Sequence, residues 1–261
     1  MRAGPRTSAA IVRNLKITLA YDGSDFCGWQ VQPERTTIQG ELAAAIERVT
    51  GSRVLPQASG RTDARVHALA QVASCQLDAG IPTENLQRAL NHLLPAAIRV
   101  LSVDEAAPGF HARKSARAKT YRYRIYRDEV CPPFLARYVY HYPYPLDEDA
   151  IRTAAAVIVG EHDFTSFAAV DPECGREEEA VSNVRTVYSS EWRHEGQELI
   201  YTVRGSGFLH HMVRNLVGTF LLVGKGTLDC AGMKRVLEAR ARSAAGPTAP
   251  ACGLYLVSVE Y

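Results

Sequence analysis

The sequence has no apolar run long enough to cross a membrane as a helix. Its longest apolar stretch in the C-terminal half, residues 216–223, has eight residues and includes Gly218, whereas a membrane-spanning helix needs about 20. Residues 1–15 include basic side chains but no apolar run follows them, so no secretory signal is expected. We therefore expect no membrane association and a cytoplasmic location.

Cysteine pairs at metal-binding spacing are also missing. The six cysteines lie far apart, Cys230 and Cys252 being the nearest two, and no CxxC or Cys/His cluster occurs. A structural zinc site is therefore not expected, and reduced thiols suit a chain of this size better than three disulfides. The sequence also lacks a P-loop and a Rossmann glycine run, which excludes the common nucleotide-binding signatures.

What the chain does contain is an ordinary globular composition with unevenly distributed charge. Its 261 residues, 46% hydrophobic and 22% charged, suffice for one large domain or two small ones, and the net charge is +2. Acids gather at residues 171–179, whereas residues 111–127 carry no acid. This basic stripe fits either a phosphate-backbone footprint or a solvated charged face. Its members are Arg113, Lys114, Arg117, Lys119, Arg122, Arg124 and Arg127.

Apolar periodicity predicts the same order of elements twice. In residues 15–21 every second side chain is apolar, which indicates a strand with one buried face. Thr36 and Gln39 fit a capping box before a helix that ends at Gly51. Strand-like segments at 53–58 and 71–77, a helix from Thr83 and a strand at 98–103 follow. The resulting β-α-β-β-α-β order is the split βαβ or ferredoxin-like arrangement.

The second copy begins with a strand at Lys119 and a helix from Asp147 to Gly160. Two strands at 183–193 and 198–204, helices from about Leu209 and at 230–241, and a strand at 253–261 follow. We therefore expect an α+β fold of two ferredoxin-like or RRM-like halves, residues 1–112 and 113–261. Their antiparallel sheets would join into one extended sheet around a central cleft.

The strand at the start of the second half alternates tyrosines and arginines. Tyr121 and Tyr123 share one face, and Arg122 and Arg124 the other. Rings and guanidinium groups suit the bases and phosphates of RNA. The alternation by itself favours an ordinary strand with a tyrosine-lined core and a solvated arginine face.

Residues 59–68, SGRTDARVHA, form a polar loop between two expected strands. Thr62 and Asp63 can satisfy local backbone N–H groups while the arginines pair with the carboxylate, which describes an ordinary turn. Loops on rigid scaffolds are also where catalytic residues gather. The residues alone leave both interpretations open.

This loop closely resembles the GRTDAGVHA signature of the TruA-type pseudouridine synthases. Five further segments resemble that family in the same order: YDG at 21–23 with GWQ at 28–30, FHAR at 110–113 with KTYRY at 119–123, HDFTSF at 162–167, FLHHMVRNLV at 208–217 and GLYL at 253–256. One position departs from the family pattern, because Arg65 stands where the pattern has glycine. Arg65 either strains a backbone that needs positive φ or keeps an ordinary backbone and adds a phosphate contact.

The resemblance implies an enzyme that detaches uracil from a tRNA ribose, rotates the base and rejoins it through carbon. That reaction needs no redox change or outside bond energy, so neither a cofactor nor a metal is implied. It implies that Asp63 is the nucleophile, that Arg214 forms an ion pair with it, and that Tyr121 stacks on the base. Arg61 would hold the RNA backbone or fill the space left by a flipped base. Weaker candidates for RNA-backbone contacts are Arg65, Arg113, Lys114 and Lys119.

Helical spacing adds that Met212 and Val213 face the core, while Arg214 lies on the other side with His211. For His67, His210 and His211 themselves, packing or hydrogen bonding is the preferred interpretation.

The resemblance further implies action on uridines 38, 39 and 40 in the tRNA anticodon stem-loop, and a homodimer whose subunits share one tRNA. The main alternative is a non-catalytic RNA-binding protein built from two RRM-like halves, which leaves the loop around Asp63 without a task. A metal-dependent nuclease using Asp63 is a second alternative, and the lack of a nearby carboxylate partner in the sequence opposes it.

Overall fold

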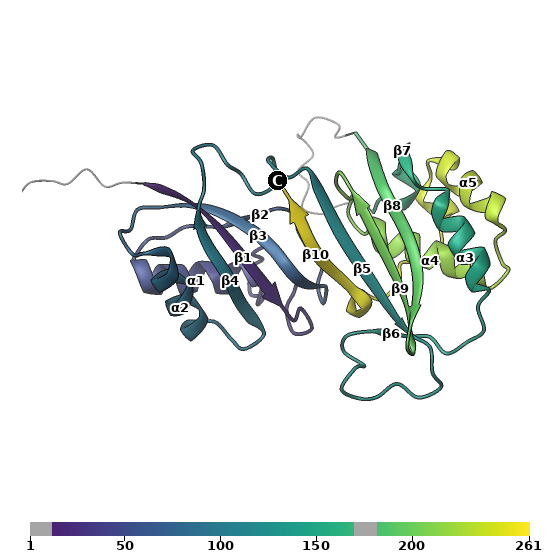
Figure 1. Ribbon diagram of the computed structural model, residues 1–261, viewed down its shortest axis with the longest axis horizontal. Coiled ribbons are helices and arrows are strands. Elements are labelled where there is room, and N and C mark those ends of the chain that lie inside the picture. Colours follow the sequence, from purple (N-terminus) through teal and green to yellow (C-terminus); the bar gives the residue numbers. More distant parts are fainter. Residues whose placement is uncertain (1–11, 170–181) are drawn as a thin grey trace, which may run out of the picture.

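The computed structural model describes residues 12–169 and 182–261, so the acidic segment at 171–179 lies outside the described residues. Within them the chain forms a ten-stranded, mostly antiparallel sheet and five α-helices, which is a mixed α+β fold. Figure 1 shows the sheet running through the molecule, with α1 and α2 at one end and α3, α4 and α5 at the other.

The first half contains three long strands and two helices. The strands β1 (Arg13–Tyr21), β3 (His67–Leu77) and β4 (Ile98–Glu105) pair in the order β4-β1-β3, and the helices are α1 (Ile38–Thr50) and α2 (Thr83–Leu93). The expected strand at 53–58 shrinks to β2 (Gln57–Ala58), which pairs with β3. Leu15, Ile17 and Leu19 are fully buried, which confirms the predicted alternation in β1.

The predicted capping box of α1 is wrong by one residue. Thr37, not Thr36, caps the helix, its side chain accepting from Gly40 N at 3.3 Å. Gln39 is buried instead, where its Oε1 accepts from Val31 N and its Nε2 donates to Pro56 O, both at 2.9 Å. A buried amide has to satisfy its own polar atoms, so Gln39 is not available to the helix terminus.

The second half follows the predicted order with two additional short strands. Its elements are β5 (Ala118–Tyr126), β6 (Tyr140–His141), α3 (Glu148–Ala156), β7 (Gly160–Asp163), β8 (Val184–Glu195), β9 (Glu198–Gly205), α4 (Met212–Gly224), α5 (Cys230–Ala239) and β10 (Leu254–Glu260). The sequence did not predict β6 or β7. In the described part of the chain, no helix is long and apolar enough to span a bilayer.

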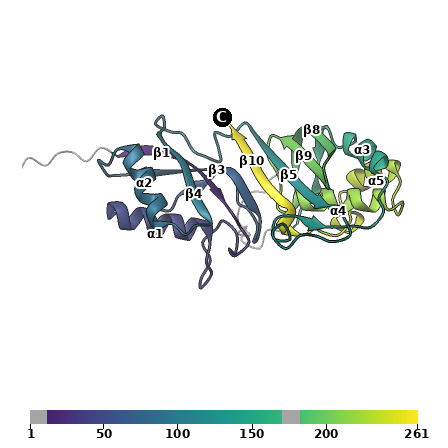
Figure 2. The same cartoon turned by 60° about the horizontal axis from the view of Figure 1, so that its bottom comes forward.

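The last strand, β10, lies in the middle of the sheet and joins the two halves. It pairs in parallel with β3 through Tyr255 and Leu256, and antiparallel with β5 along its length. The complete order is β4-β1-β3-β10-β5-β9-β8-β7, and Figure 2 shows β10 between β3 and β5 from a second direction. The loop that precedes β3 is thereby brought to the boundary between the halves.

The tyrosine–arginine strand, β5, is largely an ordinary sheet strand. Tyr123 is fully buried and donates its hydroxyl hydrogen bond to Pro250 O at 2.7 Å. Arg124 forms an ion pair with Glu198 at 2.6 Å. The burial of Tyr123 confirms the tyrosine-lined core, whereas Arg122 and Arg124 are only partly exposed and do not form a fully solvated face.

Candidate active site

Asp63 lies in the loop of residues 59–66, here called the Asp63 loop, and faces the start of α4. Its Oδ2 accepts a hydrogen bond from Arg214 Nη1 at 2.8 Å, and both side chains are mostly buried. Arg214 Nε also donates to Ala249 O at 2.8 Å, which fixes the guanidinium from a second side. A half-buried carboxylate is stabilised as an anion by a charge-assisted hydrogen bond of this kind. The structure thus brings together two residues that are 151 positions apart in the sequence.

Helix α4 presents Arg214 to this carboxylate because its other faces are apolar. Met212 and Val213 are buried in the core, as the helical spacing predicted. The helix begins after His211, whose left-handed backbone (φ 59°) turns the preceding residues back toward the Asp63 loop.

Two histidines complete the surroundings of the carboxylate, a position that their sequence did not reveal. His211 Nε2 lies 3.3 Å from Asp63 Oδ2, and His210 Nε2 lies 3.6 Å from Asp63 Oδ1. Burial is the largest effect on His211 and lowers its pKa, so this ring is neutral near pH 7. Helical spacing predicts that His211 lies on the side of Arg214, and only the position of His210 next to His211 could have suggested a similar place for His210.

Asp63, His210 and His211 also form a group that could hold a metal ion. A carboxylate oxygen and two imidazole nitrogens lie within 4.8 Å of one another. However, the Arg214 guanidinium already occupies one carboxylate oxygen and would repel a cation. The absence of a metal in the reaction remains a prediction from the family resemblance.

Tyr121 lies in β5, close enough to Asp63 for the carboxylate to act on its phenol. It is 7% exposed, and its ring packs edge-on against Phe208 with centroids 5.0 Å apart. Burial raises the pKa of the Tyr121 phenol, and the nearby Tyr21 and Asp63 raise it further. The side chain is therefore a neutral ring held next to the carboxylate.

Two glycines allow the chain after β1 to pack directly against the Asp63 loop. A Cβ on Gly23 would lie 2.0 Å from Val66 O, and one on Gly28 would lie 2.6 Å from Thr62 O. Any side chain at either position would displace the Asp63 loop, and Gly28 also has a positive φ of 86°. The YDG and GWQ segments contain these glycines, but no role for them was predicted.

Hydrogen bonds hold the Asp63 loop in the same place. Trp29 N donates to Thr62 O at 3.0 Å, and the Tyr21 hydroxyl lies 2.8 Å from Thr62 Oγ1. From β3, Gln71 Nε2 donates to Gly60 O at 3.0 Å. After Asp63, Arg65 N donates to Phe26 O at 3.3 Å. The loop is therefore fixed before and after Asp63, which is the preorganisation that a reactive group needs.

Lys119 belongs to this support and does not lie on an open RNA-binding surface, which corrects the expectation for it. Its Nζ donates to Ser59 O at 2.5 Å and joins β5 to the Asp63 loop. Burial, and after it the nearby Arg113 and Arg185, lowers the pKa of Lys119 to about 8. A cationic group with few water contacts here needs its backbone acceptor.

The remaining candidates for RNA contacts are on the surface. Arg61, Arg65, Arg113 and Lys114 are all exposed. Arg65 has φ 68°, so the first of its two sequence alternatives is correct and the backbone is left-handed. At a residue other than glycine, a left-handed backbone costs on the order of 1 kcal/mol.

The sequence matches a known family along most of its length. A sequence profile described as tRNA pseudouridine synthase matches residues 17–113 and 154–261. The chain belongs to the tRNA pseudouridine synthase family.

Individual relatives match over nearly their full length. A protein of Solibacter usitatus (strain Ellin6076) named tRNA pseudouridine synthase A is 54% identical over 250 residues, covering 96% of this chain and 100% of that protein. A protein of the same name from Moorella thermoacetica (strain ATCC 39073 / JCM 9320) is 48% identical, covering 95% and 99%. A third, from Anoxybacillus flavithermus (strain DSM 21510 / WK1), is 45% identical, covering 96% and 99%.

Proposed function

We propose that this chain isomerises uridine to pseudouridine in tRNA and that Asp63 is the nucleophile. The observation that carries the proposal is the carboxylate of Asp63, held by Arg214 at 2.8 Å on a loop fixed from both sides. The relatives named tRNA pseudouridine synthase A support the substrate class.

The reaction needs only a few catalytic groups, and the site contains a candidate residue for each of them. The bond from the ribose to N1 of uracil breaks, the base rotates, and a bond from the ribose to C5 forms. The proton at C5 leaves and N1 takes up a proton, so the product is an isomer of the substrate. Asp63 supplies the carboxylate oxygen, and Arg214 pairs with it at 2.8 Å. Tyr121 holds the detached uracil against its neutral ring, an interaction worth about 1–3 kcal/mol. The mostly buried site limits water that would trap the sugar.

Positive charge around the Asp63 loop supports an RNA substrate. Arg61 and Arg113 are exposed, and Arg185 lies close enough to Arg113 that each cation disfavours the other. Uridine in a stem has to leave its stack to reach Asp63, so base flipping follows. Arg61, two residues before Asp63, is the candidate for contacting the backbone or filling the vacated space.

We extend the proposal to the target and the assembly. The family resemblance supports uridines 38, 39 and 40 of the anticodon stem-loop, and a homodimer whose subunits share one tRNA. A tRNA substrate and five free cysteines in the described residues are compatible with a cytoplasmic location.

The strand order supports two ferredoxin-like halves. In β4-β1-β3 with β2 on the far edge of β3, and in β10-β5-β9-β8, each fourth strand pairs with the first and each third with the second. This is the connectivity of a split βαβ fold. We place the boundary between the halves at residues 112 and 113, in the connection from β4 to β5, with the cleft between them.

Tritium release from tRNA labelled at uracil C5 tests the activity. We expect release by the wild-type chain without added cofactor or metal. We also expect Asp63→Asn to abolish release and to leave tRNA affinity within a few-fold, because the substitution keeps the size of the side chain. Tight binding without any release by the wild type would instead support the non-catalytic RNA-binding protein.

A further inference from the structure

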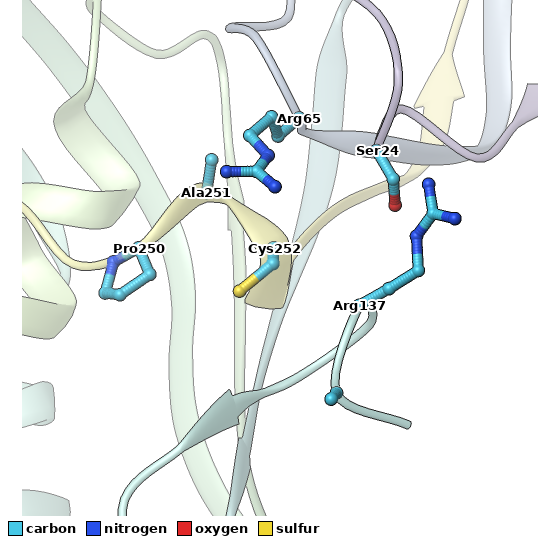
Figure 3. A pocket seen from close by; sticks show the side chains of 7 residues that line it. Ser24, Arg65, Arg137, Pro250, Ala251 and Cys252 are labelled. Atoms are coloured by element: carbon cyan, nitrogen blue, oxygen red, sulfur yellow. The ribbon is translucent and has the colours of Figure 1, made fainter. Parts of the chain in front are cut away.

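A pocket of about 240 Å³ lies beside the Asp63 loop, where four segments of the chain meet. This volume is below the range of about 300–1,000 Å³ typical of sites for larger ligands. It is lined by Ser24, Arg65, Ala136, Arg137, Pro250, Ala251 and Cys252. Figure 3 shows two guanidinium groups in this lining, with the chain of residues 250–252 forming an apolar floor.

Arg65 contributes the first guanidinium. Its side chain extends over Ala251 toward the pocket (Figure 3). Across residues 12–169 and 182–261 this guanidinium has no hydrogen bond or ion pair, and only the backbone N–H of Arg65 is bonded, to Phe26 O at 3.3 Å. A left-handed backbone at a non-glycine residue is unfavourable, and no contact of the side chain compensates for it within the fold. A role toward a ligand would account for an arginine at this position.

Arg137 contributes the second guanidinium, on the other side of Cys252. In Figure 3 it rises beside Ser24. It forms an ion pair with Asp25 at 2.5 Å, but both side chains are more than half exposed, and exposed pairs contribute little. The guanidinium of Arg137 therefore has N–H donors left for a second acceptor.

The pocket adjoins the proposed active site through two chain segments. Arg65 follows Asp63 by two residues, which places their Cα atoms at most about 7 Å apart. The floor at residues 250–252 continues directly from Ala249, whose carbonyl oxygen accepts the hydrogen bond of Arg214. An RNA backbone group bound in the pocket would therefore belong to a position close in sequence to the nucleotide whose base lies at Asp63.

Resting on the proposed function, we propose that this pocket binds one phosphodiester group of the RNA, next to the nucleotide whose base is flipped toward Asp63. Arg65 and Arg137 donate to the phosphate oxygens from opposite sides, since guanidinium forks match that geometry. The adjoining ribose packs on Pro250 and Ala251. An arginine in place of the family glycine thus gives this chain a contact with its substrate.

The first test compares Arg65→Gly with a matched control, Arg240→Gly. Arg240 is also an exposed arginine with a left-handed backbone (φ 48°), at the end of α5 and outside the pocket. Each substitution removes one positive charge and relieves a strained backbone, so both variants should melt at or above the wild-type temperature. The two variants are then distinguished by their affinity for an unmodified tRNA transcript, measured over a range of KCl concentrations.

We expect Arg65→Gly to weaken tRNA binding about 5- to 10-fold at low salt and to reduce the salt slope by about 0.7–0.9, the value of one lost phosphate contact. Arg240→Gly should change neither quantity. Ala136→Trp, which fills the pocket without changing charge, should weaken binding as Arg65→Gly does. Equal binding by the wild type, Arg65→Gly and Ala136→Trp would overturn the proposal.

The second test locates the phosphate. Anticodon stem-loop RNAs, each with one uncharged methylphosphonate linkage near the target uridine, are bound to the wild type and to Arg65→Gly. We expect one linkage whose neutralisation weakens wild-type binding but has no further effect on Arg65→Gly. The same loss in both proteins at every linkage would contradict the proposed site. Neither test requires turnover, so a wild type that fails to release tritium contradicts the proposed function alone.

Discussion

At the residue scale, the position of Asp63 depends on what its neighbours lack as much as on what they provide. Arg214 supplies the charge, but Gly23 and Gly28 supply space, since their missing side chains let the chain after β1 touch the Asp63 loop. Charged partners were predictable from the family motifs. The role of the glycines was not, because it depends on a contact between backbones that no local pattern encodes.

We predict that Gly23→Ala lowers tritium release by about 100-fold while tRNA affinity stays within a few-fold. The new Cβ would lie 2.0 Å from Val66 O, so the Asp63 loop has to move, and a shift of about 1 Å in a reacting group costs a factor of this size. Single-turnover release and equilibrium binding measure the two effects separately.

Gly80→Ala is the control for this prediction, because a Cβ on Gly80 meets nothing within 4 Å. It should release tritium at close to the wild-type rate. Wild-type release by Gly23→Ala would show that the contact with Val66 does not position Asp63.

At the element scale, the sequence predicted most elements but not their neighbours. Apolar alternation identified β1 and β5, and helical spacing identified α1, α2 and α4. Strand β6 has two residues and is too short to show a period, and the expected strand at 53–58 is reduced to the two residues of β2. The position of β10 between β3 and β5 depends on pairing between residues far apart in the chain, and the parallel pair in an otherwise mostly antiparallel sheet gave no local signal.

Strand β5 carries a pH-dependent contact through Lys119. The folded state releases the Lys119 proton at a pKa of about 8, while the unfolded chain keeps it to about 10.5. In this window the unfolded state binds more protons, so the free energy of unfolding rises with pH as the buried charge is neutralised. Below pH 8 both states are protonated and the full cost of burying the charge is present.

We predict that wild-type stability rises relative to Lys119→Met between about pH 8 and pH 10.5, by on the order of 1–3 kcal/mol. Urea unfolding of both proteins at several pH values in this range gives the difference, and groups common to both proteins cancel. A difference that stays constant across the window would mean that Lys119 is not desolvated in the folded protein.

At the scale of the whole molecule, elements from both halves of the chain share one sheet and one core. The buried cluster runs without interruption from Leu15 and Trp29 in the first half to Trp192 and Phe220 in the second. A continuous core of this kind is expected to unfold as a unit.

The two tryptophans, one in each half, test that expectation. Trp29 and Trp192 are both buried, so Trp29→Phe and Trp192→Phe leave a single reporter in the second and first half, respectively. We predict that each variant gives the same denaturation midpoint by fluorescence as by circular dichroism. Fluorescence and circular dichroism midpoints that diverge within either variant would show that the halves unfold independently.

The central position of β10 has a consequence for biosynthesis. A chain that emerges from the ribosome in order can fold its N-terminal portion early, yet Asp63 and Arg214 are joined across a seam that residues 254–260 close. The nascent protein therefore exposes the β3 and β5 edges until residues 254–260 have been synthesised. Messages cut short before that point would yield products with an unassembled centre, which cannot engage RNA productively and remain open to proteolysis.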